Sequence, residues 1–213
     1  MEETIDTFKP DLVGISYFSP NYGIAKQYAS LCKKRNLPVI VGGIHISLLP
    51  RSFSEDMDVG ILFEGEETMA MLVHLYDSLG RLDVENLSSV KGIFYRREGQ
   101  LHFTEARPLF EKLDCIPYPA GELLNLKGMH LSMFTSRGCP YRCIFCASSR
   151  FWNTTRFTSA NYIAGEIKEL YYNYGAKLIR FYDDLFIVDK QRLYNMLDIF
   201  ARENILGKVR FSC

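Results

Sequence analysis

The sequence lacks a long apolar run, an excess of charge of either sign and an apolar N-terminal segment. No run approaches the ~18 apolar residues of a membrane-spanning helix, so no membrane span is predicted. The 25 basic and 25 acidic side chains cancel, which argues against a dedicated nucleic-acid binder. The start, Met1-Glu2-Glu3-Thr4, is too polar for a secretory signal. We therefore predict a cytoplasmic protein.

What the sequence does contain is typical of a globular α/β protein. Its apolar fraction of 47% is sufficient for a sizeable core, and 213 residues predict one or two domains. Short apolar runs indicate buried strands at residues 11–16, 38–41 and 59–63. Helical spacing indicates helices between them: one carrying Ile24, Tyr28 and Leu31, one from about residue 47, and one opening at residues 64–68. This alternation predicts a parallel sheet with right-handed crossovers.

Residues 88–127 differ in character. The apolar runs 93–95 and 101–103 flank Glu98-Gly99-Gln100 and predict a β-hairpin. Residues 113–119 contain two prolines and read as an extended connector. We therefore divide the chain into residues 1–87, a hairpin and connector at 88–127, and residues 128–213.

The alternation of strands and helices resumes after the connector. Strands are expected at residues 131–135, 178–182 and 209–211. Ser159 and Asp189 are placed to cap the N-termini of two intervening helices, and Gly175 fits the end of the first. The fold class predicted is a partial Rossmann-like parallel sheet followed by the first units of a partial (β/α) barrel.

The six cysteines are unevenly distributed. Cys139, Cys143 and Cys146 lie within eight residues in the spacing C-x3-C-x2-C. Thiolates are the usual ligands of iron–sulfur clusters, and three of them leave the fourth iron of a cubane cluster open. A zinc site completed by Cys115, Cys213 or His130 is the alternative, although zinc sites favour two paired C-x2-C units.

The cysteine segment, Thr135-Ser136-Arg137-Gly138-Cys139-Pro140-Tyr141-Arg142-Cys143-Ile144-Phe145-Cys146, resembles the signature of radical S-adenosylmethionine (SAM) enzymes. Phe181-Tyr182-Asp183-Asp184-Leu185-Phe186 resembles the second barrel strand of the subgroup with an N-terminal cobalamin (B12)-binding domain. Val41-Gly42-Gly43-Ile44-His45 and Glu64-Gly65-Glu66-Glu67-Thr68 resemble loops of that domain. The resemblance covers nearly the whole chain.

The resemblance implies that the three clustered cysteines hold a [4Fe–4S] cluster whose open iron binds SAM. One electron from the cluster would cleave SAM and give a 5′-deoxyadenosyl radical, which abstracts a hydrogen atom from a small-molecule substrate. It also implies that Phe145 lies near the adenine and that Asp183 and Asp184 lie near the methionyl amine. A flavodoxin or ferredoxin is the electron donor expected for such chemistry.

The N-terminal part is expected to associate with cobalamin. Ligands of parallel α/β sheets bind at the carboxyl ends of strands, where Gly42, Gly43 and the segment Glu64-Gly65-Glu66 stand. The D-x-H-x-x-G motif that supplies a cobalt ligand elsewhere is absent. We therefore interpret His45 as facing solvent or bonding its own loop.

Two departures from the family pattern lead us to expect a chain truncated at both ends. The strand–helix–strand portion that normally begins the cobalamin domain is missing, and residues 131–213 hold little more than two barrel units. The sequence thus predicts a cobalamin-associated radical SAM enzyme, acting by methyl transfer, cyclisation or rearrangement. The alternative is a non-catalytic zinc- or cluster-binding interaction module.

Overall fold

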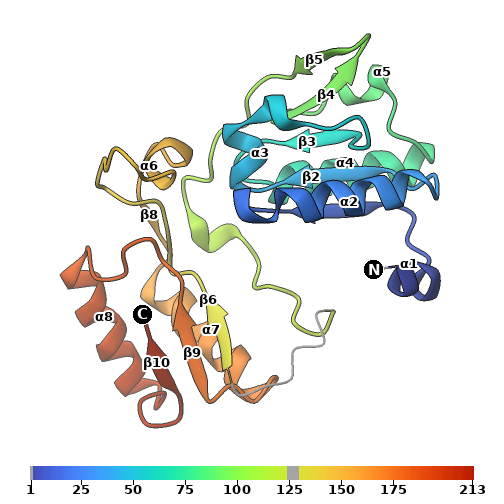
Figure 1. The fold of residues 1–213 in the computed structure, drawn as a ribbon. Coiled ribbons are helices and arrows are strands. Elements are labelled where there is room, and N and C mark those ends of the chain that lie inside the picture. The colour runs from blue at the N-terminus through green and yellow to red at the C-terminus, as the bar shows by residue number, and fades with distance from the viewer. Residues whose placement is uncertain (1, 124–129) are drawn as a thin grey trace. The chain divides into compact units, whose positions relative to one another are not determined.

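The computed structural model describes residues 2–123 and 130–213 and divides into two compact units (Figure 1). The first unit is Met1–Leu109 and the second is Phe110–Cys213. The boundary predicted at residue 127 lies outside the described residues, and the three-part division stays a prediction. None of the described helices combines the length and apolar character needed to cross a membrane.

A five-stranded sheet in the order β1-β2-β3-β4-β5 forms the first unit. β1 (Val13–Ser16), β2 (Val39–Gly42) and β3 (Val59–Ile61) are parallel, as predicted. β4 (Ile93–Arg97) and β5 (Gln100–Phe103) form the predicted hairpin. Because β4 pairs antiparallel with β3, the hairpin extends this sheet.

Helices cover both faces of this sheet. Successive residues of a strand point to opposite sides, so neighbouring residues of β2 show which helix covers each face. Val39 and Val41 share a core with α2 (Tyr22–Lys33), whereas Ile40 shares another with α4 (Glu66–Leu79). The shorter helical elements of this unit are α1 (Glu2–Phe8), η1 (Ser19–Asn21), α3 (Ile44–Leu48), η2 (Pro50–Ser52) and α5 (Val84–Leu87). α1 and α5 were not predicted, and α3 begins three residues earlier than expected.

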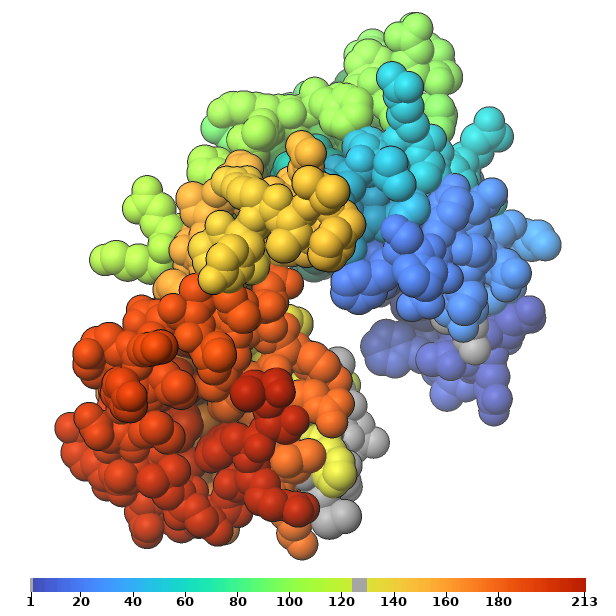
Figure 2. Space-filling model, turned by 60° about the vertical axis from the view of Figure 1, so that its left-hand side comes forward, coloured from blue at the N-terminus to red at the C-terminus, as the bar shows by residue number. Residues whose placement is uncertain are grey.

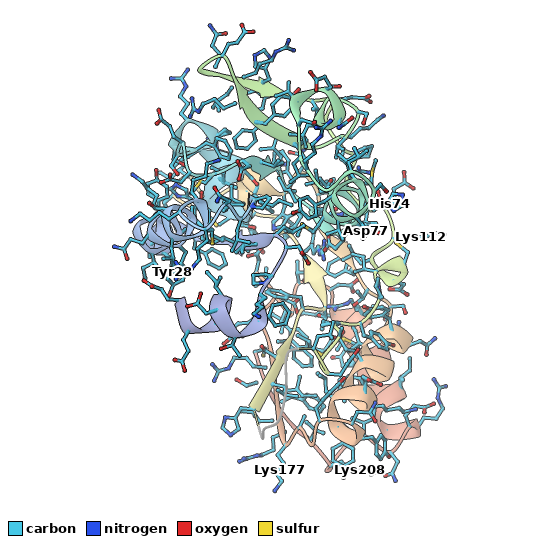
Figure 3. All side chains as sticks on the ribbon, turned by 90° about the vertical axis from the view of Figure 1, so that its right-hand side faces the viewer. Tyr28, His74, Asp77, Lys112, Lys177 and Lys208 are labelled. Carbon is cyan, nitrogen blue, oxygen red and sulfur yellow. The ribbon has the colours of Figure 1, made fainter. Side chains whose placement is uncertain are left out.

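α2 packs against the sheet through small side chains. Ala25, Ala29 and Cys32 are buried, whereas Ile24 and Tyr28 are 50% and 39% exposed. Tyr28 lies on the outer side of the helix (Figure 3). The helix itself was predicted correctly from Ile24 and Tyr28, but these two side chains do not form its buried face. The buried face carries the small residues instead, because they allow the helix to approach the sheet closely.

The second unit contains three parallel strands in the order β10-β9-β6. These are β6 (His130–Met133), β9 (Leu178–Phe181) and β10 (Arg210–Ser212), connected through α7 (Ala160–Tyr172) and α8 (Lys190–Arg202). The unit also includes η3 (Leu113–Cys115), β7 (Ser136–Arg137), α6 (Ser148–Phe151) and β8 (Arg156–Phe157), with β7 and β8 antiparallel. The predicted strand–helix alternation is confirmed.

The ends of α7 and α8 follow the predicted capping pattern. Ser159 Oγ accepts a hydrogen bond from Tyr162 N at 3.1 Å, and Asp189 Oδ1 accepts one from Arg192 N at 3.0 Å. Gly175, with φ +72°, turns the chain after α7. Such caps satisfy backbone groups that a helix leaves unpaired.

The connector packs along α7 within the second unit. Asp114 Oδ1 accepts a hydrogen bond from Ser159 N at 2.7 Å, and the Tyr162 hydroxyl donates to the Ile116 carbonyl at 2.9 Å. The rings of Tyr118 and Tyr162 meet edge-on with centroids 4.7 Å apart. These contacts hold the connector in place.

Glu166 lies one turn after Tyr162 on α7 and is only 6% exposed. Burial disfavours its charged form and raises its pKa from 4.5 to about 7. Between these two values the folded chain binds more protons than the unfolded chain. This carboxyl therefore lowers the free energy of unfolding as the pH rises from about 4.5 through about 7.

Glu166→Gln should remove this dependence, because glutamine carries no charge. We expect the variant to exceed the native chain in free energy of unfolding by about 1–3 kcal/mol at pH 8.5 and by little at pH 4.5. Urea unfolding of both chains at the two pH values measures the difference. A gain of equal size at both values would contradict the assignment.

Candidate functional site

The first unit has an open groove at the carboxyl ends of its parallel strands. Its volume is about 430 Å³. The residues that line it come from the three strands and the segments after them: Gly14, Ile15, Ser16, Ile40, Val41, Gly42, Gly43, Ile61, Phe63, Gly65, Glu66 and Met69. This is where α/β sheets of this type bind ligands.

The structure brings four predicted site residues to this groove. Gly42 and Gly43 follow β2, while Gly65 and Glu66 begin α4. Glu64 is buried and is not among the lining residues. No lysine or arginine of the described part of the chain lines the groove, which therefore suits an uncharged, largely apolar portion of a ligand better than a phosphate.

Gly43 is required by its backbone conformation and its surroundings. Its φ is +98°, and a Cβ there would lie 2.7 Å from the Tyr17 carbonyl oxygen and 3.0 Å from Ser16 Oγ. A side chain would therefore push apart the segments that follow β1 and β2. Gly43 allows these segments to meet at the groove.

His45 lies in α3 and bonds neighbouring segments; the predicted alternative that it faces solvent is wrong, because the side chain is buried. It is 7% exposed, with Nδ1 2.8 Å from Ser19 Oγ and Nε2 3.1 Å from Ser52 Oγ. Its ring stacks on Tyr22 with centroids 4.9 Å apart. Because both ring nitrogens are engaged, His45 is a structural residue that connects α3 to η1 and η2.

The second unit carries the cysteine loop, here residues 137–147. The loop begins in β7, and Gly138 at its start has φ +93°. A Cβ on Gly138 would lie 2.5 Å from the Thr154 carbonyl oxygen. The loop lies at the surface, where Figure 2 shows its residues in gold. Gly138 therefore permits the close approach of two chain segments at the base of this loop.

All three clustered cysteines are free thiols, of which Cys139 and Cys146 are half-buried and Cys143 is exposed. Cys146 N donates to the Cys143 carbonyl at 3.1 Å, which folds that part of the loop into a turn. Across residues 2–123 and 130–213, no three His, Cys, Asp or Glu side chains are arranged to hold a metal ion. Three accessible thiols on one loop nevertheless fit the donor set of an iron–sulfur cluster. They stay a predicted ligand set.

Asp183, just after β9, is bonded to the segment that follows β6. Its Oδ1 accepts hydrogen bonds from Thr135 N (2.7 Å), Ser136 N (2.6 Å) and Ser136 Oγ (2.9 Å). Its Oδ2 accepts one from Thr135 Oγ1 at 2.6 Å. These four bonds fix the approach to the cysteine loop.

Asp184 contacts the other end of the loop. Its Oδ2 accepts a hydrogen bond from Ser148 Oγ at 2.5 Å, and Ser148 stands two residues after Cys146. Asp184 is exposed, so its carboxylate remains accessible to a ligand. Phe145 is 89% exposed on the loop. The cofactor roles implied for Phe145, Asp183 and Asp184 stay predictions.

The Thr135 carbonyl connects this region to the rest of the unit. It accepts hydrogen bonds from Thr158 N (3.1 Å), Thr158 Oγ1 (3.0 Å) and Arg192 Nη2 (2.8 Å). Burial lowers the pKa of Arg192, and the charges of Asp183 and Asp189 act in the opposite direction. No motif in the sequence pointed to Thr158 or Arg192, which lie 23 and 57 residues from Thr135.

The two units each contain a parallel α/β sheet, with an open groove at the strand ends of the first and a loop of three free cysteines beyond the strand ends of the second. Residues 1–73 match the family model of the B12 binding domain. An uncharacterized methyltransferase of Pyrococcus horikoshii is 33% identical over 88% of this chain and 42% of its own length. The anaerobic magnesium-protoporphyrin IX monomethyl ester cyclase of Rubrivivax gelatinosus is 31% identical over 80% of this chain and 33% of its own length.

A solved structure shares the fold. It is the radical SAM methyltransferase TsrM of Kitasatospora setae with cobalamin and a [4Fe–4S] cluster bound. It superposes with a TM-score of 0.71 at 19% identity, over 95% of this chain and 44% of TsrM. These matches confirm the predicted resemblance to cobalamin-binding radical SAM enzymes and the predicted fold class. The chain spans less than half the length of these relatives.

Gly138→Ala should destabilise the base of the cysteine loop. Gly175 offers a matched control, since its φ is +72° but a Cβ there would meet nothing within 4 Å. We expect Gly175→Ala to lower the free energy of unfolding by about 1 kcal/mol through backbone strain alone. Gly138→Ala should lower it by at least ~1 kcal/mol more. Urea unfolding measures both variants. If the two lose the same free energy of unfolding, the contact with Thr154 is unimportant.

Proposed function

We propose that this chain is part of a cobalamin-associated radical SAM enzyme acting on a small molecule. Three free, accessible thiols on one loop, anchored at the carboxyl ends of parallel strands, carry the proposal. The relatives support it: their names describe methyltransferases and a cyclase. Methyl transfer, cyclisation and rearrangement are the reaction classes proposed, with a flavodoxin or ferredoxin as electron donor.

In this proposal each part of the second unit has a defined task. Cys139, Cys143 and Cys146 bind the [4Fe–4S] cluster. A cluster held there would supply the electron for reductive cleavage of SAM. Phe145 would lie near the adenine, and the accessible carboxylate of Asp184 would lie near the methionyl amine.

The first unit binds cobalamin in its groove. The apolar lining formed by Ile15, Val41 and Phe63 excludes water from the bound face, and the backbone at Gly42 and Gly43 allows close approach. His45 would not serve as a cobalt ligand, because its two ring nitrogens bond serine hydroxyls.

Anaerobic reconstitution with iron and sulfide tests the cluster. The reduced native chain should give a cubane-cluster signal in electron paramagnetic resonance, and added SAM should alter it because SAM binds the open iron. Changing all three clustered cysteines to alanine should abolish the signal. A Cys115→Ala/Cys213→Ala variant, which removes two other exposed thiols, should retain it.

The outcomes separate the enzyme from its alternative. A cluster signal that does not change when SAM is added would contradict SAM binding at an open iron. One tightly bound zinc and no cluster signal would favour the non-catalytic interaction module.

Gly43→Ala tests the groove. The added methyl group must displace the Tyr17 backbone, so we expect affinity for hydroxocobalamin to fall at least ~10-fold, which corresponds to about 1.4 kcal/mol. Gly23→Ala is the control, because a Cβ at Gly23 meets nothing within 4 Å and the residue lies on α2. Absorbance titration measures both. Unchanged binding by folded Gly43→Ala protein would place cobalamin elsewhere.

A further inference from the structure

Two adjacent carboxylates after β9 hold opposite ends of the cysteine loop. Asp183 bonds Thr135 and Ser136, which precede the loop, and Asp184 bonds Ser148, which follows it. The partners of the two aspartates are thus separated by the whole cysteine motif. We propose that Asp183 and Asp184 are positioning residues that clamp the loop and present its thiols to the cluster from a fixed base.

The environment of Asp183 favours this role over direct contact with a cofactor. Both of its carboxylate oxygens already accept hydrogen bonds, four in total, and their donors Thr135 and Ser136 are buried. Bonds to a charged acceptor are about twice as strong as neutral ones. Recruiting Asp183 to a ligand would release the strand end that leads to Cys139.

The exit of the loop is held by a second set of contacts. Ser148 and Ser149 are buried at the start of α6. Ser149 Oγ donates to the Cys146 carbonyl at 3.0 Å, next to the bond from Ser148 to Asp184. The last cysteine is therefore tied to the helix that Asp184 anchors. Asp184 can keep this bond through one oxygen while the other meets a ligand.

Hydrogen exchange on the chain without metal tests the clamp directly. Asp184→Ala and Ser148→Ala remove the same hydrogen bond from opposite sides, so each should accelerate amide exchange of residues 143–148 at least ~10-fold. The double variant should exchange no faster than either single one, because the two changes share one interaction. Asp183→Asn, which preserves shape and one acceptor oxygen, should accelerate exchange at residues 135–140 with the fold retained.

Ser159→Ala is the matched control, since it removes the α7 cap without touching the cysteine loop. Its loop exchange should equal that of the native chain. Three outcomes would overturn the clamp. The loop amides of Asp184→Ala could exchange at the native rate, or the effects of the two single changes on exchange could add in the double variant. Ser159→Ala could also accelerate exchange of the loop as much as Asp184→Ala does.

A second measurement links the clamp to the cluster and rests on the proposed function. In reconstituted protein, Asp184→Ala should lose cluster absorbance to an iron chelator several-fold faster than native protein and Ser159→Ala. Equal rates would overturn the presentation role. If native protein takes up no cluster, the proposed function fails, whereas the exchange measurements still decide whether the clamp exists.

Discussion

The carboxylate of Asp183 ties the carboxyl ends of β6 and β9 together in the second unit, and the geometry of the cysteine loop depends on this connection. Parallel strands bring their ends to one edge of a sheet, but they do not orient the segments beyond that edge. Four hydrogen bonds from Thr135 and Ser136 supply the orientation. The Thr135 carbonyl then extends the connection to Thr158 and to Arg192 on α8. The loop thus starts from a rigid polar junction.

The two units arrange their strand ends for different chemistry. In the first unit, glycines and apolar side chains leave an open groove with little charge. In the second, the buried Thr135 and Ser136 side chains bond Asp183, while the three clustered cysteines are half-buried or exposed. An apolar groove gains binding energy by releasing water, whereas a metal cluster needs donors that can reach it. Each unit therefore offers what its proposed cofactor requires.

Much of this architecture could be predicted because it depends on neighbours in the sequence. Apolar runs identified the parallel strands, and Ser159 and Asp189 identified helix starts. The buried face of α2 could not be predicted, because close packing favoured Ala25 over the larger Ile24. The partners of Asp183 lie 47 and 48 residues away, and no local pattern encodes such pairs. The glycines of the groove were expected at strand ends, but their cofactor roles still rest on resemblance.

The tethering of the cysteine loop at both ends has a consequence for metal uptake. A loop whose ends are held by neighbouring residues samples far fewer conformations than a free segment of the same length. If the three cysteines bind iron as proposed, the first thiol to capture it makes the other two intramolecular ligands at an effective concentration of about millimolar or higher. Assembly should then be strongly cooperative: partially ligated states remain scarce, and the chain passes from empty to fully ligated over a narrow range of iron concentration.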